Sequence, residues 1–473
     1  MREETSFGPF DCVSPLDFRY YGTSRTLFKK LAPFVSERAR VAYELKVEVA
    51  LVEVLANRGL CTREVAEEVK RGAEKVTAEE VAAEEERIQH NTRALVNSLR
   101  AKVPEAARRF IHFGLTSFDV VDTATALRFK ELTEKVLLPD LIRLEANLIR
   151  LARREKETIQ IGRTHGQHAV PITFGFAMAE YVSRLGNRIE AVKAAAENLR
   201  GKISGAVGAY NAMSLLVPDP EEVERELLAR LGLKPSTHST QIVEPEYLVD
   251  YVHSLISTFG VLANLADDLR HLQRTEIAEV GEVFEAAQVG SSTMPQKRNP
   301  LNFENVKSMW KAFFPRMLTC YADQISEHQR DLTNSASQRF IPEIAVGLES
   351  CVERLNRVIP KLVVDRDNME KNLELTGDSV VAEALYILLA SQGHPDAHEE
   401  VRRLTLLAEK TGENLYSIAL ADKGVEPHLA RLSPEQVRVL KSPENYSGMA
   451  AIKAREVCDE WSARLGIKES EEK

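Results

Sequence analysis

The sequence lacks the features that mark several large classes of protein. Its five cysteines are scattered along the chain, and none stands in a CxxC or CxxH spacing. This pattern argues against a disulfide framework and a zinc site, and it favours a reducing compartment such as the cytosol. No stretch approaches about 18 uninterrupted apolar residues, so no membrane span is expected. The N-terminal stretch carries early acids and no apolar core, so no signal peptide is expected either.

Concentrated positive charge is also missing. The net charge is −9, and there is no Lys/Arg tract and no basic half. Because nucleic acids are bound by clustered positive surfaces, the sequence predicts no nucleic-acid partner. A small anionic ligand needs only a few cations and is not excluded. The apolar fraction of 44% and the charged fraction of 28% are ordinary for a soluble globular protein.

Helical periodicity is abundant, whereas strand-like alternation is scarce. Residues 38–58 predict an amphipathic helix, and residues 119–156 predict a long one that Pro139 should kink or divide. In residues 247–272 the apolar positions recur every three or four residues. Helices of this size are roughly 35–50 Å long, which suits a bundle whose helices also pack against other subunits. We therefore expect an all-α fold.

Helix length divides the chain into three predicted helical domains, which are residues 1–114, 115–366 and 367–473, with the long helices in the central one. The periodicity fails at residues 112–119, 162–171, 201–210 and 289–300. Interruptions of long helices are costly unless a function uses them, so we expect the functional residues there. Short extended pieces are expected near 160–162 and 202–207.

The most informative interruption reads GSSTMPQKRNP at residues 290–300. Its Gly and two Pro exclude a helix interior, and its hydroxyls followed by Lys297 and Asn299 make a polar loop able to fold over an anion. An ordinary connection between helices, with a Ser cap, has the same composition. The whole string decides between these readings: it is similar to the signature loop GSSxMPxKxNP of the fumarase/aspartase superfamily, matched at every fixed position.

Two other interruptions carry histidines, in GRTHGQH at 162–168 and HFGLTSFD at 112–119. A His pair could bind a metal, but no third ligand stands beside it, so no metal site is expected. His165 suits proton transfer, because the ordinary pKa of histidine, about 6.5, is close to neutrality. Thr116 and Ser117 precede a predicted helix, where they would cap its start, seat an anion, or do both. His90, taken alone, reads as a surface helix residue.

Together these motifs resemble the adenylosuccinate lyase family, from Arg19-Tyr20 through the helix after Phe340. Argininosuccinate lyases carry a Gly-Arg-Ser-Arg-Asn-Asp type segment where this chain has HFGLTSFDVVDT. Cycloisomerase relatives usually lack the histidine that stands here as His165. The departures from the family pattern are Asn91, where Asp is frequent, and Gln296, where His or Tyr is common.

The resemblance implies that fumarate is eliminated from adenylosuccinate and from succinyl-aminoimidazole carboxamide ribotide, without metal or cofactor. Ser291 would be the base, and His165, with Glu304 as its carboxylate partner, would protonate the departing amine. Lys297 and Asn299 would hold the carboxylate that takes up charge.

His112 would help to fix the substrate. The resemblance also implies a set of substrate-binding residues for the phosphate, the ribose and the succinyl carboxylates, which comprises Arg19, Tyr20, His90, Thr116, Ser117, Thr164, Gln241, Arg330, Ser335 and Arg339. It further implies a cytoplasmic homotetramer whose central twenty-helix core builds each site from three chains.

Two alternatives remain at this point. One is an argininosuccinate lyase-like enzyme. The other is a non-catalytic structural protein, because some superfamily members have become lens crystallins. The intact Ser291, Lys297, His165 and Glu304 argue against the structural alternative.

Overall fold

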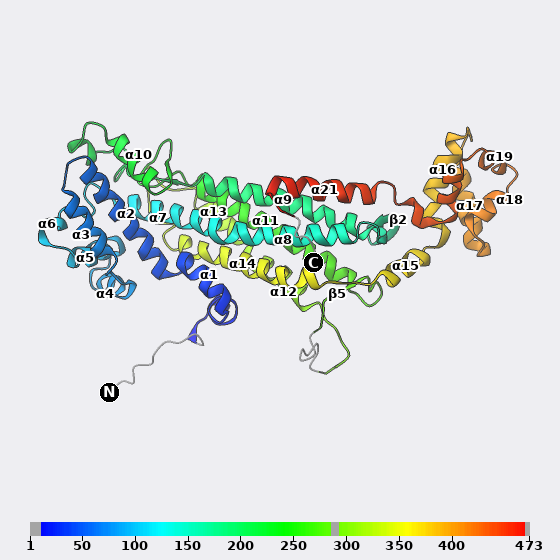
Figure 1. The fold of residues 1–473 in the computed structure, drawn as a ribbon, viewed down its shortest axis with the longest axis horizontal. Coiled ribbons are helices and arrows are strands. Elements are labelled where there is room, and N and C mark those ends of the chain that lie inside the picture. Colours follow the sequence, from blue (N-terminus) through cyan, green and yellow to red (C-terminus); the bar gives the residue numbers. More distant parts are fainter. Residues whose placement is uncertain (1–10, 285–292, 469–473) are drawn as a thin grey trace. The chain divides into compact units, whose positions relative to one another are not determined.

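The computed structural model describes residues 11–284 and 293–468. Helices dominate these residues, and the strands among them form three two-stranded sheets (Figure 1). The pairs are β1 (Ile159–Thr164) with β2 (Gln167–Thr173), β3 (Arg200–Gly201) with β4 (Lys234–Pro235), and β5 (Val280–Gly281) with β6 (Val363–Val364). The all-α fold class is confirmed.

Contacts between elements divide the chain into two compact units. The first unit comprises Met1–Leu141, Arg188–Gly260 and Ser308–Glu353, and the second comprises Ile142–Asn187, Val261–Lys307 and Arg354–Lys473. The divisions fall inside the long helices α8 (Leu138–Arg154), α9 (Phe174–Glu197), α11 (Glu246–Leu272), α12 (Leu301–Phe313) and α14 (Ile341–Val358). The three domains predicted from sequence were divided by helix length, whereas these two units are divided by contacts. The predicted boundaries are therefore not tested and stay a prediction.

The first unit is built around α2, which contacts α1, α3, α4, α7 and α10. Apart from the long helices that the division crosses, the helices of this unit are η2 (Leu16–Tyr20), α1 (Arg25–Val35), α2 (Glu37–Asn57), α3 (Arg63–Ala73), α4 (Ala78–Ile88), α5 (Asn91–Ala101), α6 (Glu105–Arg108), α7 (Ser117–Leu132), η3 (Thr133–Leu137), η4 (Met213–Leu215), α10 (Pro220–Arg230), α13 (Arg316–Ala322) and η5 (Ser337–Phe340).

The second unit contains a separate apolar core made by its C-terminal helices, in which Leu385, Leu389, Leu404 and Ala419 are buried. Its elements after α14 are η6 (Ile359–Lys361), α15 (Arg366–Leu375), η7 (Gly377–Val381), α16 (Ala382–Ser391), α17 (Ala397–Thr411), α18 (Leu415–Ala421), α19 (Glu426–Leu429), α20 (Pro434–Lys441), η8 (Pro443–Tyr446) and α21 (Ala450–Leu465).

The predicted helix at 38–58 is confirmed as α2, but its amphipathic character is wrong. Between its first turn and its last residue, the exposed and half-buried residues form one stripe, at positions 42, 46, 49, 53 and 56, which includes the apolar Ala42 and Val49, whereas the residues of its other sides are buried. Two carboxylates, Glu44 and Glu48, are buried among them. A charged group in such a place needs a specific partner, since burying an unpaired charge is costly.

At Pro139, where a kink or a division is expected, the chain stays helical and passes through a π-helical turn. Helix α7, η3 and α8 follow one another directly, and the Leu138 N–H donates to the Thr133 carbonyl, five residues earlier. Proline has no N–H to donate, and Pro139 stands where the helix changes from π to α geometry.

One of the two expected extended pieces is wrong. The piece at 160–162 lies in β1, whereas residues 202–207 are irregular and only Arg200–Gly201 pairs as a strand. Side chains take the place of a strand partner here: the Lys202 N–H donates to Thr123 Oγ1 at 3.0 Å, and the Ser204 N–H donates to Asp119 Oδ1 at 3.1 Å.

Helix α11 is the one described helix long and apolar enough to cross a membrane by length and composition. Within the structure, 67% of its qualifying window is buried, and Tyr251 and Phe259 are fully buried. This burial is typical of the core helix of a globular protein.

Candidate active site

His112 lies in a tight turn before α7, with its backbone in the left-handed region (φ +59°). A carboxylate from α2 holds this turn. The backbone N–H of His112 donates to Glu48 Oε2 at 2.8 Å, and Nδ1 of its ring lies 2.7 Å from Glu48 Oε1. Left-handed backbone costs on the order of 1–3 kcal/mol in a non-glycine residue, so it persists only where surrounding contacts impose it.

The same carboxylate sets the charge of His112. Burial alone would lower the pKa of His112, but the hydrogen bond and charge of Glu48 outweigh it, and the pKa is raised above its ordinary value. Asp119 acts in the same direction and Arg93 opposes it. The ring is 18% exposed. His112 can therefore present a cation to an anionic ligand.

Thr116 is the N-cap of α7, and Ser117 is the first residue of the helix. The Thr116 N–H donates to Asp119 Oδ2 at 2.7 Å. The expected capping position is confirmed. Both residues are half-buried, so the start of α7, with its N–H groups and hydroxyls, is accessible to a ligand.

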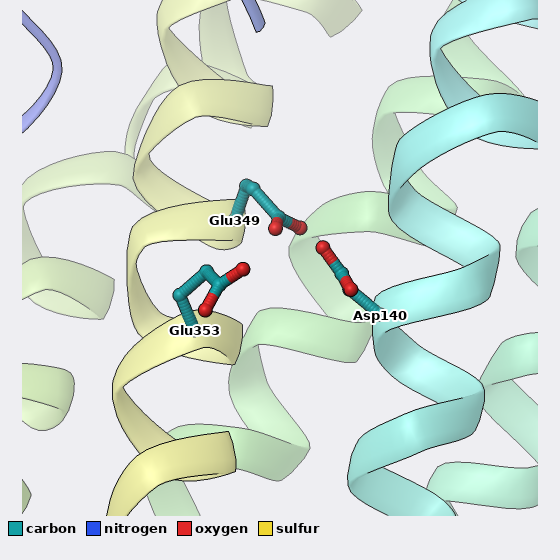
Figure 2. Close-up of side chains that lie close together, drawn as sticks. All are labelled: Asp140, Glu349 and Glu353. Carbon is teal, nitrogen blue, oxygen red and sulfur yellow. The ribbon is translucent and has the colours of Figure 1, made fainter. Parts of the chain in front are cut away.

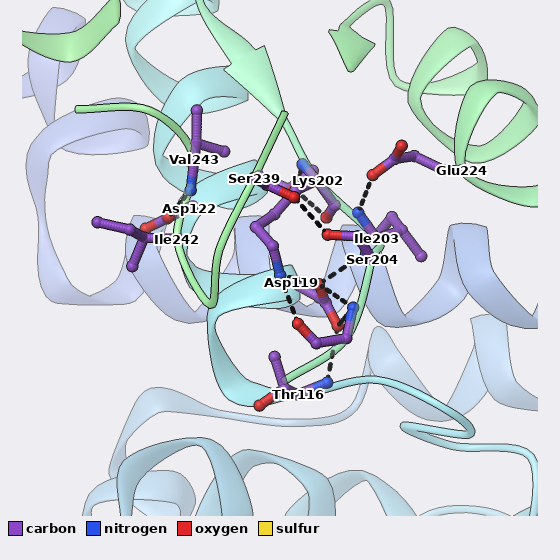
Figure 3. Close-up of polar contacts among 12 residues, drawn as sticks. Thr116, Asp119, Asp122, Lys202, Ile203, Ser204, Glu224, Ser239, Ile242 and Val243 are labelled. Carbon is purple, nitrogen blue, oxygen red and sulfur yellow. Dashed lines mark hydrogen bonds and ion pairs between the residues drawn. The ribbon is translucent and has the colours of Figure 1, made fainter. Parts of the chain in front are cut away.

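Asp119 is the centre of a buried polar network (Figure 3). It is fully buried and forms an ion pair with Lys202, which is fully buried as well. Its Oδ1 accepts the N–H groups of Ser204, at 3.1 Å, and of Gly205, at 3.2 Å. The Lys202 ammonium also donates to the Gly205 carbonyl at 3.0 Å. This network joins the start of α7 to the interruption at 201–210, and the site residues expected from sequence did not include it.

Gln241 and Arg330 are brought together with the start of α7. The Gln241 N–H donates to the carbonyl of Gln329, the neighbour of Arg330. The Arg330 guanidinium lies 4.6 Å from the ring centre of Phe118, which follows Ser117. One of its nitrogens donates to Asn334, whereas Nε and Nη1 are buried with no hydrogen-bond partner in the part of the chain that the structure describes. Burial lowers the pKa of Arg330.

The remaining expected residues of the first unit lie at the surface. His90 is exposed and caps α5, where its Nδ1 accepts the Arg93 N–H at 3.2 Å. His90 is therefore the N-cap of a helix and not, as predicted from the sequence alone, a residue within a surface helix. Arg19, Ser335 and Arg339 are exposed and Tyr20 is half-buried; Arg19 and Tyr20 belong to η2, and Arg339 belongs to η5.

In the second unit, His165 stands at the tip of the β1–β2 hairpin. Thr164 pairs with Gln167, so His165 and Gly166 form a two-residue loop, and both have positive φ, +55° and +74°. This is the geometry of a type I′ turn. Thr164 and His165 are exposed. An ion pair between Arg163, two residues before His165, and the fully buried Glu279 anchors the loop end of the hairpin.

His168 has a different environment. Its Nδ1 is bonded to the Thr376 hydroxyl, and burial lowers the pKa of this histidine. This side chain therefore has a structural partner, whereas that of His165 is exposed.

Ser291 of the signature loop lies outside the described residues. At the end of the loop, Lys297 is exposed and Asn299 is half-buried. The buried carboxylate of Glu282 caps the helix that follows: it accepts the N–H groups of Asn302 at 2.9 Å and Phe303 at 3.0 Å. Burial raises the pKa of Glu282 in spite of these bonds.

Glu304 is exposed in the first turn of α12. Across residues 11–284 and 293–468, no hydrogen bond joins Glu304 to His165, the pair expected to work together. A partnership between these two residues stays a prediction.

One carboxylate cluster in the first unit has the geometry of a metal site, with ligand atoms of Asp140, Glu349 and Glu353 within 4.8 Å of one another (Figure 2). The Lys30 ammonium forms ion pairs with all three. Burial and the nearby Asp140 raise the pKa of Glu349 well above its usual range. The Lys30 ammonium therefore supplies positive charge to this cluster.

Comparisons with known proteins agree with this arrangement. A family model described as Lyase matches residues 19–312, and one described as Adenylosuccinate lyase C-terminal matches residues 326–436. The adenylosuccinate lyase of Archaeoglobus fulgidus is 33% identical over 449 residues, covering 94% of this chain and 98% of that protein. That of Pyrococcus horikoshii is 34% identical over 451 residues, covering 94% and 96%.

Solved structures share the fold. The 3-carboxy-cis,cis-muconate lactonizing enzyme of Pseudomonas putida aligns with a TM-score of 0.82 and 25% identity, covering 96% of this chain and all of that one. A fumarate lyase of a Mesorhizobium species aligns with a TM-score of 0.80 and 24% identity, covering 91% and 97%.

The helical fold and the intact signature loop are those of the fumarase/aspartase superfamily. About one third of the residues are identical to those of the two archaeal adenylosuccinate lyases over nearly the whole chain, and the C-terminal family model matches as well. These matches narrow the assignment from the superfamily to one family. The chain belongs to the adenylosuccinate lyase family.

Proposed function

We propose that this chain eliminates fumarate from adenylosuccinate, giving AMP, and from succinyl-aminoimidazole carboxamide ribotide, giving aminoimidazole carboxamide ribotide. The observation that carries the proposal is family membership across both matched regions together with an intact GSSTMPQKRNP loop. The enzyme is a carbon–nitrogen lyase of purine biosynthesis. It acts in the cytoplasm and uses no metal or organic cofactor.

The reaction breaks a carbon–nitrogen bond after a proton is removed beside a carboxylate. Such a proton is very weakly acidic, so the charge that develops on the carboxylate must be stabilised. Ser291 removes the proton, and Lys297 and Asn299 hold the charged carboxylate. His165 protonates the departing amine, with Glu304 as its partner. An acid and a base on opposite faces give anti elimination.

Substrate binding uses the accessible start of α7 and the arginines near it. Thr116, Ser117, Thr164 and Gln241 bind the succinyl carboxylates, and His112 and His90 fix the substrate. Arg330, Ser335 and Arg339, with Arg19 and Tyr20, bind the phosphate and ribose. Two buried nitrogens of Arg330 without a partner in the described chain support this role, because a phosphate oxygen would satisfy them.

The enzyme acts as a homotetramer whose sites take residues from several chains. An exposed apolar stripe on and beside α13 supports the association: Phe314, Leu318, Tyr321 and Ile325 are 42%, 69%, 43% and 81% exposed. Leu318 and Tyr321, three residues apart, lie on one face of α13, and Phe314 and Ile325 flank the helix. Large apolar side chains gathered in this way are typical of a surface that packs against another protein.

A mixture of two inactive variants tests the shared site. If His165 and Ser291 of one site come from different subunits, His165→Ala and Ser291→Ala chains refolded together should regain up to about 25% of wild-type activity, because about a quarter of sites receive both wild-type residues. Each variant refolded alone is the control. An inactive mixture, with mixed tetramers verified by mass, would contradict the shared site.

The activity itself is tested with three substrates in parallel. The purified protein should cause loss of the ultraviolet absorbance of succinyl-AMP and turn over the succinylated carboxamide ribotide, but leave argininosuccinate unchanged. Turnover of argininosuccinate alone would favour the other enzyme class. A flat trace with all three would favour a structural protein.

A further inference from the structure

Glu48 is a buried carboxylate whose two oxygens both face His112. It lies on α2, 64 residues before His112, and is fully buried. One oxygen accepts the backbone N–H of His112 at 2.8 Å, and the other lies 2.7 Å from Nδ1 of the ring. Every hydrogen bond that residues 11–284 and 293–468 give to Glu48 goes to His112.

This geometry determines which ring nitrogen carries the proton. An ionised carboxylate only accepts hydrogen bonds, so Nδ1 must donate to it. In the neutral ring Nε2 then has no proton, and in the cation Nε2–H points away from Glu48 and is available to a ligand. The bond to the backbone N–H holds the left-handed turn that aims the ring.

The other charged groups that face His112 do not replace Glu48. From α7, Asp119 is already paired with the buried Lys202 and accepts several backbone N–H groups. From α5, the charge of Arg93 opposes protonation of His112. The carboxylate of Glu48 is therefore the group that supports the cationic ring.

We propose that Glu48 is a positioning residue of this active site: it holds His112 as the Nδ1–H tautomer, favours its cationic form, and so directs Nε2–H toward an anionic oxygen of the substrate. The part that concerns substrate binding rests on the proposed function of His112. The part that concerns the tautomer and charge of His112 stands on the contacts alone.

Glu48→Gln separates these effects from simple packing. The glutamine has nearly the same size, but it offers one acceptor oxygen and one donor NH2. The backbone N–H of His112 can still donate to the side-chain oxygen of the glutamine. The NH2 group of the glutamine then donates to an unprotonated Nδ1 of the ring. The substitution should therefore move the proton of the neutral ring to Nε2 and disfavour the cation. Glu53→Gln, the same change at a partly exposed position on α2, is the matched control.

The pH dependence should change in a defined direction. In the wild type Glu48 raises the pKa of His112, so the cation persists to higher pH. In Glu48→Gln burial is no longer opposed by that charge, so the pKa falls and the alkaline limb of kcat/KM moves to lower pH. At pH 8 we expect KM to rise about tenfold or more, with a smaller change in kcat, and the difference should shrink toward pH 6. Glu53→Gln should match the wild type.

A double-mutant cycle isolates the route through His112. In a His112→Ala background, Glu48→Gln should have almost no further effect on KM. Equal losses at every pH, or full additivity with His112→Ala, would show that Glu48 has only a structural role and would overturn the proposal.

The charge and tautomer are measured without turnover, by nitrogen-15 NMR of histidine-labelled protein with the His112 signal assigned through His112→Ala. We expect protonated Nδ1 in the wild type across the titration, and a change of tautomer in Glu48→Gln. An Nε2–H tautomer in the wild type would overturn the proposal even if Glu48→Gln fails to fold. A wild-type protein that has this Nδ1–H tautomer but does not act on succinyl-AMP would instead refute the proposed function.

Discussion

Ser291→Ala is expected to lower kcat by several powers of ten while substrate affinity stays within about tenfold. The reason is that a general base acts chiefly in the transition state. A serine hydroxyl is a poor base unless loop amides and nearby cations lower its pKa in a closed, dry site. The prediction rests on the position of Ser291 in the GSSTMP string and on family membership.

The measurement is a steady-state assay with succinyl-AMP, accompanied by calorimetric binding of the substrate to the inactive variant. Ser292→Ala, the same change at the neighbouring serine, is the matched control and should lose far less activity. If Ser291→Ala keeps more than a few per cent of wild-type kcat, Ser291 is not the base.

Lys202→Met is expected to lower the free energy of unfolding by about 3–5 kcal/mol, the effect of breaking a buried ion pair from one side. Both Lys202 and Asp119 are fully buried, so the substitution leaves an uncompensated carboxylate in the protein interior. The backbone N–H groups that still donate to Asp119 should keep the loss within this range. Because the network holds the start of α7, substrate affinity should fall as well.

Denaturant unfolding at one fixed protein concentration measures the effect, since the proposed association would also contribute to stability. Lys135→Met is the matched control: its ion pair with Glu131 is exposed, and such pairs contribute less than about 1 kcal/mol. Adding Asp119→Asn to Lys202→Met should recover part of the loss by removing the unpaired charge. Equal effects of Lys202→Met and Lys135→Met would contradict a buried pair that matters to stability.

The local features of this protein could be predicted from its sequence. The apolar repeat at 247–272 predicted α11 to within a residue, because a helical period leaves its mark at every third or fourth position. Pro139 marked the start of α8, although the π turn that precedes it was not predicted. The signature loop identified the superfamily, because its chemistry needs adjacent residues in a fixed order.

Long-range contacts are where sequence reasoning failed. The expected strand at 202–207 is absent because Thr123 and Asp119, on a helix about 80 residues earlier, take the backbone donors that a strand partner would accept. Glu48 was missed although it stands in the apolar run VEVALVEVL, where a charged residue signals a buried partner. The sequence of this run does not identify His112 as the partner of Glu48.

The sequence by itself therefore determined the helical fold class and the superfamily, and it predicted the reacting groups, because periodicity and contiguous motifs are local properties of the chain. Only the tertiary structure decided which carboxylate raises the pKa of His112 and orients its ring, and which lysine pairs with Asp119. It also decided which nitrogens of Arg330 are buried without a partner in the described chain. Each of these depends on which side chains packing brings within about 3 Å of one another, across separations of 64 and 83 residues in two of the cases. A hydrogen bond or ion pair is selected by distance in the folded chain, and no repeat in the sequence records it.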